Sequence, residues 1–362
     1  MSVLRNGSSP LPGRGAREMY AVLLSGRRTV EVGKVPRPQL DEPGQVLLRM
    51  AYAGICGSDL HYYRDGRIGD QKVRFPMIVG HEGTAQVVEV SEGVTKLRSG
   101  QDVVLDPALV CGACDQCRTG RANTCRALRF LGSPGGPAGC MAEYLVMPES
   151  CCHPLPPQVS RRQGVLAEPL SIALHTLRLL GPHLPQTMAI LGAGPIGLCL
   201  LAAASANGVR GIYVTDPLDW RCEAALRLGA EWAASPNTTD MLREILGAMP
   251  GGVEVVVECC GEQAALDQAL QLLAPGGKLA IVGIPRTNKV RLDINLLRRK
   301  ELTILNVRRQ NACLAEALTL LAGQLHDLAL VTHEYPLCDA PRAFAAAAAY
   351  EHGIIKAVVR LQ

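Results

Sequence analysis

The sequence MAILGAGPIG, residues 188–197, joins a short apolar run to three glycines, Gly192, Gly194 and Gly197, in G-x-G-x-x-G spacing. The apolar run predicts a buried strand, and the residues IGLCLLAAASANG that continue from it predict a helix. In that context the first glycine makes the turn, the second lets a pyrophosphate approach the backbone, and the third packs helix against strand. Together with Pro195 and Ile196, these glycines predict a dinucleotide site at a helix N-terminus.

The next apolar run, GIYVTD, ends at Asp216, twenty-four residues after Gly192. A carboxylate at this distance meets the ribose hydroxyls and repels a 2′-phosphate, so we expect NAD as cofactor. Arg221 follows five residues later and is a second cofactor-binding candidate, which could partly offset that repulsion. The plainer alternatives are that Asp216 caps the following helix and that Arg221 is a surface residue.

The pattern of apolar residues before this stretch differs from the pattern that begins with it. From about Met188, strand-like runs alternate with helical stretches, which is typical of a doubly wound parallel sheet. From Tyr20 to about Pro156, short apolar runs are broken by Gly and Pro, which favours an antiparallel, barrel-like region. The closing run IIKAVVRL has little to pair with locally, so we expect the last segments to return to the first domain. The predicted fold is α/β, with a Rossmann domain at 166–307 and a discontinuous β-rich domain at 18–165 and 308–362.

Composition narrows the classes of protein. The chain has 362 residues, a formal net charge of +4 and few aromatic side chains, so it is typical of a two-domain globular protein with a core of Ala, Leu and Val. The small charge disfavours a nucleic-acid partner, and no apolar run is long enough to cross a membrane. Residues 1–17 lack the apolar segment of a signal peptide and are predicted to be a disordered extension. We expect a cytoplasmic protein, in which the fourteen cysteines bind metal or stay reduced.

The most specific local motif is CGACDQCRTGRANTC, residues 111–125, which places Cys111, Cys114, Cys117 and Cys125 in C-x2-C-x2-C-x7-C spacing. Four thiolates complete a tetrahedral zinc shell, and we predict a structural zinc in a lobe at 108–128. An iron–sulfur cluster is the rival, but the ferredoxin pattern has three residues before its last cysteine, which a proline follows. Free thiols are the plainer alternative.

A four-thiolate site is coordinatively full, so chemistry needs a second metal site with a free position. Candidate ligands are Cys56 in GICGSDLHYY, His81 and Glu82 in VGHEGTAQVV, and Glu168 in LAEPLSIALH. Three such ligands would leave a fourth position for water or an alcohol, as in catalytic zinc sites. Each residue alone is ambiguous, because a lone Cys is more often a small buried hydrophobe.

In combination these motifs resemble a known family. GICGSDLH, GHEGTAQVVEV, the four-cysteine lobe and LGAGPIG occur in the order found in zinc-dependent medium-chain alcohol dehydrogenases. The resemblance runs from about Tyr20 to the C-terminus and implies a GroES-like catalytic domain with two zincs per subunit, a Rossmann domain, and an active site between them. It also suggests a homotetramer.

Details of the resemblance point to the sorbitol (L-iditol) and xylitol dehydrogenase branch. That branch has AEP where ordinary alcohol dehydrogenases supply a second cysteine ligand, which implies that Glu82 binds zinc and that Glu168 binds it directly or through water. Ser58 and His61 match a proton relay, for which Glu168 is the alternative route, and His61 could equally be a surface residue.

Substrate-pocket positions of the branch match Tyr62, Phe130, Glu168 and Arg309. Where animal sorbitol dehydrogenases read Phe-Arg-Tyr, this chain has Arg308, Arg309 and Gln310, so we expect an altered pocket. An arginine fork suits a polyhydroxylated substrate or a carboxylate.

We therefore expect a zinc enzyme that transfers a hydride from a secondary alcohol of a polyol to NAD, which yields a ketose. The alternatives are a sugar-acid (L-idonate- or galactonate-like) or threonine-type zinc dehydrogenase, a zinc-free quinone or enoyl reductase, and a non-enzymatic binding protein on the same fold.

Overall fold

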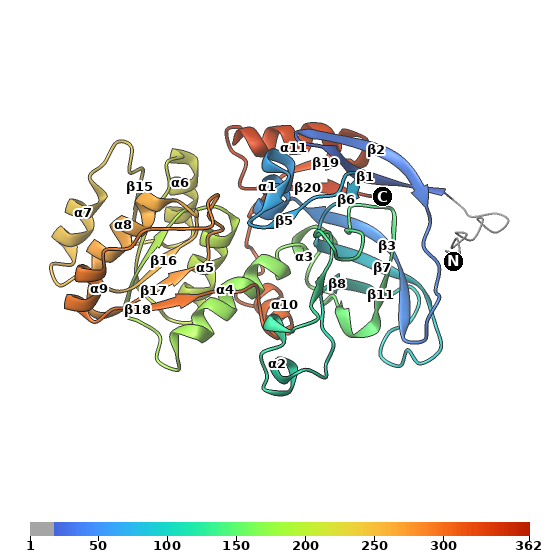
Figure 1. Ribbon diagram of the computed structural model, residues 1–362, viewed down its shortest axis with the longest axis horizontal. Coiled ribbons are helices and arrows are strands. Elements are labelled where there is room, and N and C mark those ends of the chain that lie inside the picture. The colour runs from blue at the N-terminus through green and yellow to red at the C-terminus, as the bar shows by residue number, and fades with distance from the viewer. Residues whose placement is uncertain (1–17) are drawn as a thin grey trace, which may run out of the picture.

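The computed structural model describes residues 18–362; the extension predicted for residues 1–17 lies outside the described residues. The described chain forms two lobes that lie side by side (Figure 1). Residues of the Rossmann-type lobe make a parallel sheet wrapped by helices, and the other lobe is rich in antiparallel strands. None of the helices in the described range is both long and apolar enough to cross a membrane.

The parallel sheet has six strands in the order β15-β14-β13-β16-β17-β18. This is the Rossmann order, which reverses direction between β13 and β16, and ligands bind beside that point at the carboxyl ends of the strands. Its strands are β13 (Thr187–Leu191), β14 (Gly211–Thr215), β15 (Trp232–Ala234), β16 (Val253–Glu258), β17 (Leu273–Ile281) and β18 (Thr303–Asn306). Its helices are α5 (Pro195–Ala206), α6 (Asp219–Arg227), α7 (Met241–Ala248), α8 (Gln263–Leu272) and α9 (Ile294–Lys300).

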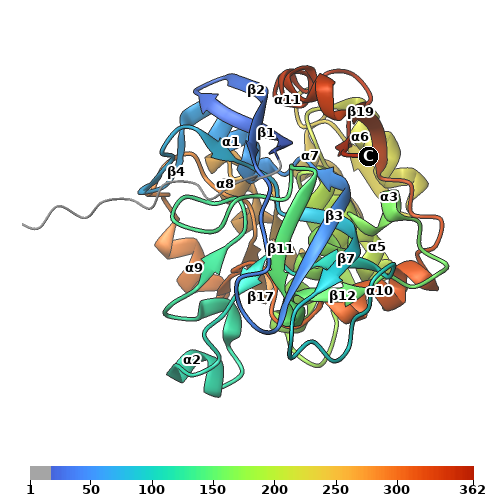
Figure 2. The ribbon, with the colours of Figure 1, turned by 90° about the vertical axis from the view of Figure 1, so that its right-hand side faces the viewer.

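The second lobe is built on a seven-stranded sheet in the order β12-β8-β7-β3-β20-β19, with β11 also paired to β3 (Figure 2). These strands are β3 (Gln45–Gly54), β7 (Glu82–Val90), β8 (Asp102–Leu105), β11 (Tyr144–Pro148), β12 (Cys152–Pro154), β19 (Val331–Pro336) and β20 (Lys356–Arg360). A three-stranded sheet contains β1 (Glu18–Gly26), β2 (Thr29–Pro36) and β6 (Met77–Ile78). The remaining strands form two small ribbons, β4 (Arg67–Ile68) with β5 (Gln71–Lys72) and β9 (Ala108–Leu109) with β10 (Arg129–Phe130).

The last strand lies in the sheet of the N-terminal residues. Strand β20 pairs antiparallel with β3, with Val359 opposite Ala53, and parallel with β19. The chain therefore leaves this lobe after β12, forms the parallel sheet and comes back. Helix α11 (Ala340–Ala349) lies on this lobe beside α1 (Gly57–Asp65), as Figure 1 shows.

Helices at the junction join the two lobes. Helix α4 (Ala167–Leu180) packs against α5 and α10 (Leu314–Ala322) in one buried apolar cluster. That cluster also contains Val104 of β8 and Val358 of β20, so it reaches from the parallel sheet into the antiparallel one. Many of its members are Ala, Leu or Val, as the composition predicted. The short α3 (Arg161–Gly164) leads into α4.

Candidate functional site

The four cysteines of residues 111–125 come together on a projection that carries α2 (Asp115–Arg118) and the 3₁₀ turn η1 (Ala122–Thr124). Their sulfur atoms lie 3.6 Å apart for Cys114–Cys117, 3.9 Å for Cys114–Cys125, 3.5 Å for Cys111–Cys125 and 4.0 Å for Cys111–Cys117. A tetrahedron of sulfurs around zinc, with bonds of about 2.3 Å, has edges of about 3.8 Å. The spacing fits one tetrahedral ion, whereas an iron–sulfur cluster spreads its cysteines over several iron atoms.

Backbone N–H groups favour the thiolate form of two of these four cysteines. Those of Arg126 and Cys117 lower the pKa of Cys114 to about 6, and those of Ala113 and Cys114 lower the pKa of Cys111. Thiolates are the ligand form that zinc requires. All fourteen cysteines, each within the described range, are free of disulfides.

A second cluster contains Cys56, His81 and Glu82, whose ligand atoms all lie within 4.8 Å of one another. Cys56 caps the N-terminus of α1, and His81 and Glu82 stand at the start of β7. Sequence analysis predicted all three as ligands of one ion, and their donor set of thiolate, imidazole and carboxylate suits zinc.

Asp59 holds this cluster in place, and sequence analysis missed it. Its Oδ2 accepts the Cys56 N–H at 3.0 Å, and its Oδ1 lies 3.6 Å from Nδ1 of His81. A carboxylate behind a histidine sets the ring orientation and leaves the other nitrogen for a metal. The available signal was an aspartate three residues after Cys56 in GICGSDLH.

Lys356 is the other residue that sequence analysis missed. Its Nζ donates to both carboxylate oxygens of Glu82, at 2.7 and 2.6 Å, and to the carbonyl oxygen of Ile55 at 3.2 Å. Lys356 and Glu82 are both buried. Burial alone would lower the pKa of Lys356, but the charge of Glu82 raises it, so Lys356 stays protonated.

Glu168 lies near this cluster but is not one of its three close members. It stands in the first turn of α4, is 3% exposed, and its Oε2 has no hydrogen-bond partner. Burial raises the pKa of Glu168 to about 7. A buried carboxyl group with this pKa can take or give a proton near neutrality. Its Oε2 atom is available to accept a hydrogen bond from a ligand.

Ser58 and His61 lie on α1 beside the metal cluster. His61 Nδ1 is 3.7 Å from Oδ2 of Asp65, and burial lowers the pKa of His61 although Asp65 opposes that shift. The side chain of His61 lines a cavity of about 580 Å³ that also includes Pro285 and Arg286 of the parallel-sheet lobe. His61 therefore faces a cavity that residues of both lobes line.

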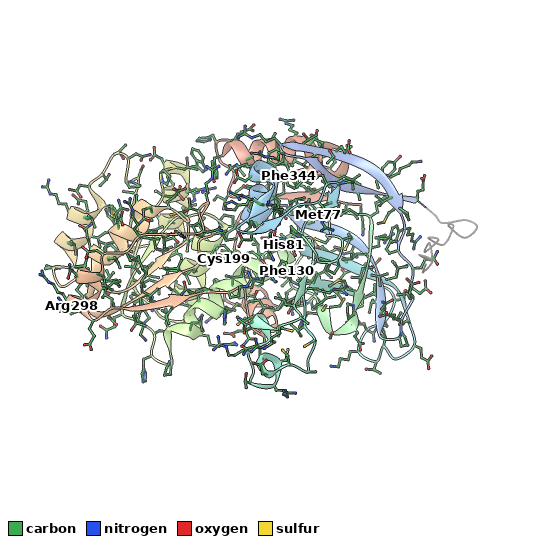
Figure 3. All side chains as sticks on the ribbon, viewed as in Figure 1. Met77, His81, Phe130, Cys199, Arg298 and Phe344 are labelled. Atoms are coloured by element: carbon green, nitrogen blue, oxygen red, sulfur yellow. The ribbon has the colours of Figure 1, made fainter. Side chains whose placement is uncertain are left out.

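Two of the predicted substrate residues, Arg309 and Phe130, stack on each other. The guanidinium carbon of Arg309 is 3.5 Å from the centre of the Phe130 ring, and that ring is 5.2 Å from the His81 ring. Figure 3 labels His81 and Phe130 together near the junction of the lobes. Burial lowers the pKa of Arg309 to about 10 and raises that of Tyr62 to about 12, so Arg309 stays charged and Tyr62 neutral. Nη1 of Arg309 is buried without a partner.

The glycine turn has the space that a dinucleotide needs. A Cβ on Gly197 would collide with the carbonyl oxygen of Gly192, whereas a Cβ on Gly194 would meet only Arg221 Nη1, at 3.7 Å. Asp216, at the end of β14, accepts the Ala193 N–H at 2.8 Å, and Arg221 Nη1 lies 3.5 Å from its carboxylate. The predicted cofactor residues therefore surround one open cradle at the N-terminus of α5, where Pro195 and Ile196 form the first turn.

Glu258 also shapes this turn and was not predicted. It ends β16 opposite Leu191, and its Oε1 accepts the N–H groups of Cys260 and Gly261. Gly192 approaches Cys260 so closely that a Cβ there would lie 3.1 Å from the Cys260 Cβ. The carboxylate thus braces the backbone against which the glycine turn packs.

Comparison with known proteins identifies the family of this chain. Residues 42–157 match the alcohol dehydrogenase GroES-like domain, and residues 195–323 match the zinc-binding dehydrogenase domain. The chain is 34% identical to sorbitol dehydrogenase of Bacillus subtilis over 95% of its own length and 97% of that protein. The chain belongs to the zinc-dependent medium-chain alcohol dehydrogenases.

This dehydrogenase is also similar to relatives with other substrates. It is 34% identical to L-threonine 3-dehydrogenase of Pyrococcus horikoshii, over 88% of this chain and 92% of that one. The solved structure of L-idonate 5-dehydrogenase from Escherichia coli superposes with a TM-score of 0.87 at 26% identity, over 95% of this chain and 98% of that one. The predicted family, the fold of GroES-like and Rossmann domains, the dehydrogenase class and the cofactors zinc and NAD are confirmed.

Proposed function

We propose that this enzyme oxidises a secondary alcohol of a polyol of the sorbitol, L-iditol or xylitol type to a ketose. The observation that carries the proposal is the incomplete ligand set of Cys56, His81 and Glu82, beside the unpaired carboxyl oxygen of Glu168 and the free guanidinium of Arg309. Such a group of side chains offers ligands to a metal and several polar atoms to a substrate with many hydroxyls.

Each residue has a distinct part in the proposed reaction. Cys56, His81 and Glu82 hold the catalytic zinc, which supplies a Lewis acid that lowers the pKa of the substrate hydroxyl, while NAD supplies the hydride acceptor. Glu168 takes up the hydroxyl proton, since burial gives its carboxyl group a pKa of about 7. Ser58 and His61 form the alternative proton route, toward the cavity that His61 lines.

Other residues bind and orient the reactants. Arg309, stacked on Phe130, donates to substrate oxygens, and Tyr62 donates its buried hydroxyl. Asp216, with Arg221 beside it, would bind the ribose hydroxyls of NAD, and the pyrophosphate would lie on the glycine turn at the N-terminus of α5. The thiolates Cys111, Cys114, Cys117 and Cys125 hold the structural zinc. From the family resemblance we also propose a cytoplasmic homotetramer, whose size sedimentation would measure.

A sugar acid is the second candidate substrate. No ion pair in the described part of the chain involves Arg309, whose half-buried guanidinium, with Nη1 unpartnered, would form a bidentate contact with a carboxylate. The similarity to L-idonate 5-dehydrogenase agrees with this alternative.

The decisive experiment measures NADH formation from sorbitol, xylitol, L-iditol, galactitol, L-idonate and L-threonine, with NADP in place of NAD as the control. Polyol turnover with NAD is the expected result. Turnover of L-idonate alone would establish the sugar-acid alternative, and turnover confined to L-threonine would overturn the substrate class.

A further inference from the structure

The backbone around Arg309 has an unusual conformation. Arg309 has φ of 53° and Ala312 has φ of 54°, both in the left-handed region that side chains other than glycine rarely adopt. Conformations of this kind persist where the surrounding structure holds them, and they cluster at functional sites. The turn at 308–312 therefore requires contacts from outside its own sequence.

Two of these contacts come from the four-cysteine lobe. Nδ2 of Asn123 donates to the carbonyl oxygen of Arg308 at 2.9 Å, and Nδ2 of Asn311 donates to the carbonyl oxygen of Gly120 at 2.7 Å. One bond thus precedes Arg309 and the other follows it. Gly120 and Asn123 both lie between Cys117 and Cys125, so the two bonds start from a loop whose ends are metal ligands.

The remaining contacts come from the body of the enzyme. Gln310 Nε2 donates to Oδ2 of Asp106 at 2.9 Å, and its Oε1 accepts the Cys313 N–H at 2.9 Å. Arg178 of α4 donates to the carbonyl oxygen of Asn311 at 3.0 Å. These bonds fix the C-terminal half of the turn. By contrast, the carbonyl of Arg308, which sets the direction of the Arg309 backbone, is bonded to Asn123 of the lobe.

We propose that the four-cysteine lobe positions Arg309 in the substrate pocket, with Asn123 and Asn311 as the positioning residues. The lobe then acts on substrate affinity as well as on stability. This inference rests on the proposed function to the extent that Arg309 contacts the substrate. The contact between the lobe and the turn does not depend on the substrate, and hydrogen exchange measures it directly.

The test compares Asn123→Ala, the isosteric Asn123→Asp and a control, Thr119→Ala. Asn123→Asp keeps the shape of the side chain but puts an oxygen in place of the donor that faces the Arg308 carbonyl. Thr119 lies in the same lobe and bonds only to carbonyls of Asp115 and Gln116. Asn123 also lies 3.3 Å from Nε2 of His175, so a fourth variant, His175→Ala, separates that contact.

Two measurements are made on each zinc-loaded variant. Hydrogen exchange of the peptide that spans residues 307–314 should quicken in both Asn123 variants and stay unchanged in the control. The KM for the polyol should rise about three- to tenfold with kcat nearly unchanged, since one positioning hydrogen bond is lost. Zinc content and the Kd for NADH should match the parent enzyme.

Unchanged exchange at 307–314 in Asn123→Asp would overturn the positioning role, whatever the substrate proves to be. Faster exchange with an unchanged KM would also overturn the link to substrate affinity. If no polyol is turned over by the parent enzyme, the proposed function fails, and the exchange measurement still decides whether the lobe holds the turn.

Discussion

Lys356 Nζ lies 2.6 Å from Oε2 of Glu82, in a buried ion pair that joins the first residue of β20 to the first residue of β7. The two residues are 274 positions apart in the sequence. The pair balances the charge of a carboxylate that we propose as a zinc ligand, and it ties the C-terminal strand to the metal cluster. A buried charge without such a partner would be costly.

Replacing Lys356 with Met should therefore destabilise the enzyme by about 3–5 kcal/mol, because Glu82 would keep a buried charge without its partner. Urea unfolding of the metal-free protein, in which no zinc balances the charge of Glu82, measures the change. The control is Lys34→Met, which removes an exposed pair with Glu18 and should change the stability little, because solvent screens such a pair. An equal loss of stability in the two variants would show that the buried pair contributes no more to the free energy of unfolding than the exposed pair.

Replacing Glu168 with Gln should leave NAD binding intact and lower kcat by about 100-fold or more, since an amide cannot take the proton that the carboxyl group exchanges near neutrality. Steady-state kinetics and titration with NADH measure the two quantities. Turnover at the parent rate would exclude Glu168 from the chemistry and leave Ser58 and His61 as the proton route.

Replacing Cys117 with Ser should lower the zinc content from about two ions per subunit to about one and lower the melting temperature by at least about 5 °C. Metal analysis and calorimetry measure the effect. Cys338→Ser is the matched control, because Cys338 is an exposed free thiol outside both clusters. A full complement of zinc in Cys117→Ser would contradict the four-thiolate site.

Replacing Asp216 with Asn should raise the preference for NADP relative to NAD by about tenfold or more, because the charge that repels a 2′-phosphate is removed while an acceptor oxygen is kept. The ratio of kcat/KM for the two cofactors is the readout. Arg221 lies 3.5 Å from the Asp216 carboxylate, so it is the group that would meet the phosphate. Adding Arg221→Ala should abolish the gain, and a gain that persists would point to another anion contact.

The motifs whose residues lie close together in the chain could be predicted from the sequence. The glycine spacing at 192–197 after an apolar run, and the cysteine spacing at 111–125, are local patterns whose chemistry depends on separations of a few residues. The family and fold inferred from them are confirmed. The individual site roles and the domain boundaries stay predictions, to which the distances and sheet pairings above add support.

Contacts between residues that are far apart in the sequence could not be predicted from a local motif. Asp59 stood within a quoted motif, but its contact with His81 depends on how α1 lies against β7. Gln310 stands where animal sorbitol dehydrogenases have Tyr. Its side-chain amide donates to Asp106, and that contact explains the substitution.

The fold class and the cofactor type could be predicted from the amino-acid order, because the glycine and cysteine motifs depend on short spacings that any conformation of the chain preserves. The pairing of Lys356 with Glu82, the stacking of Arg309 on Phe130 and the bond from Asn123 to Arg308 exist only in the folded chain. Chain folding brings these residues together across more than 170 positions, and no periodicity or motif encodes such a contact.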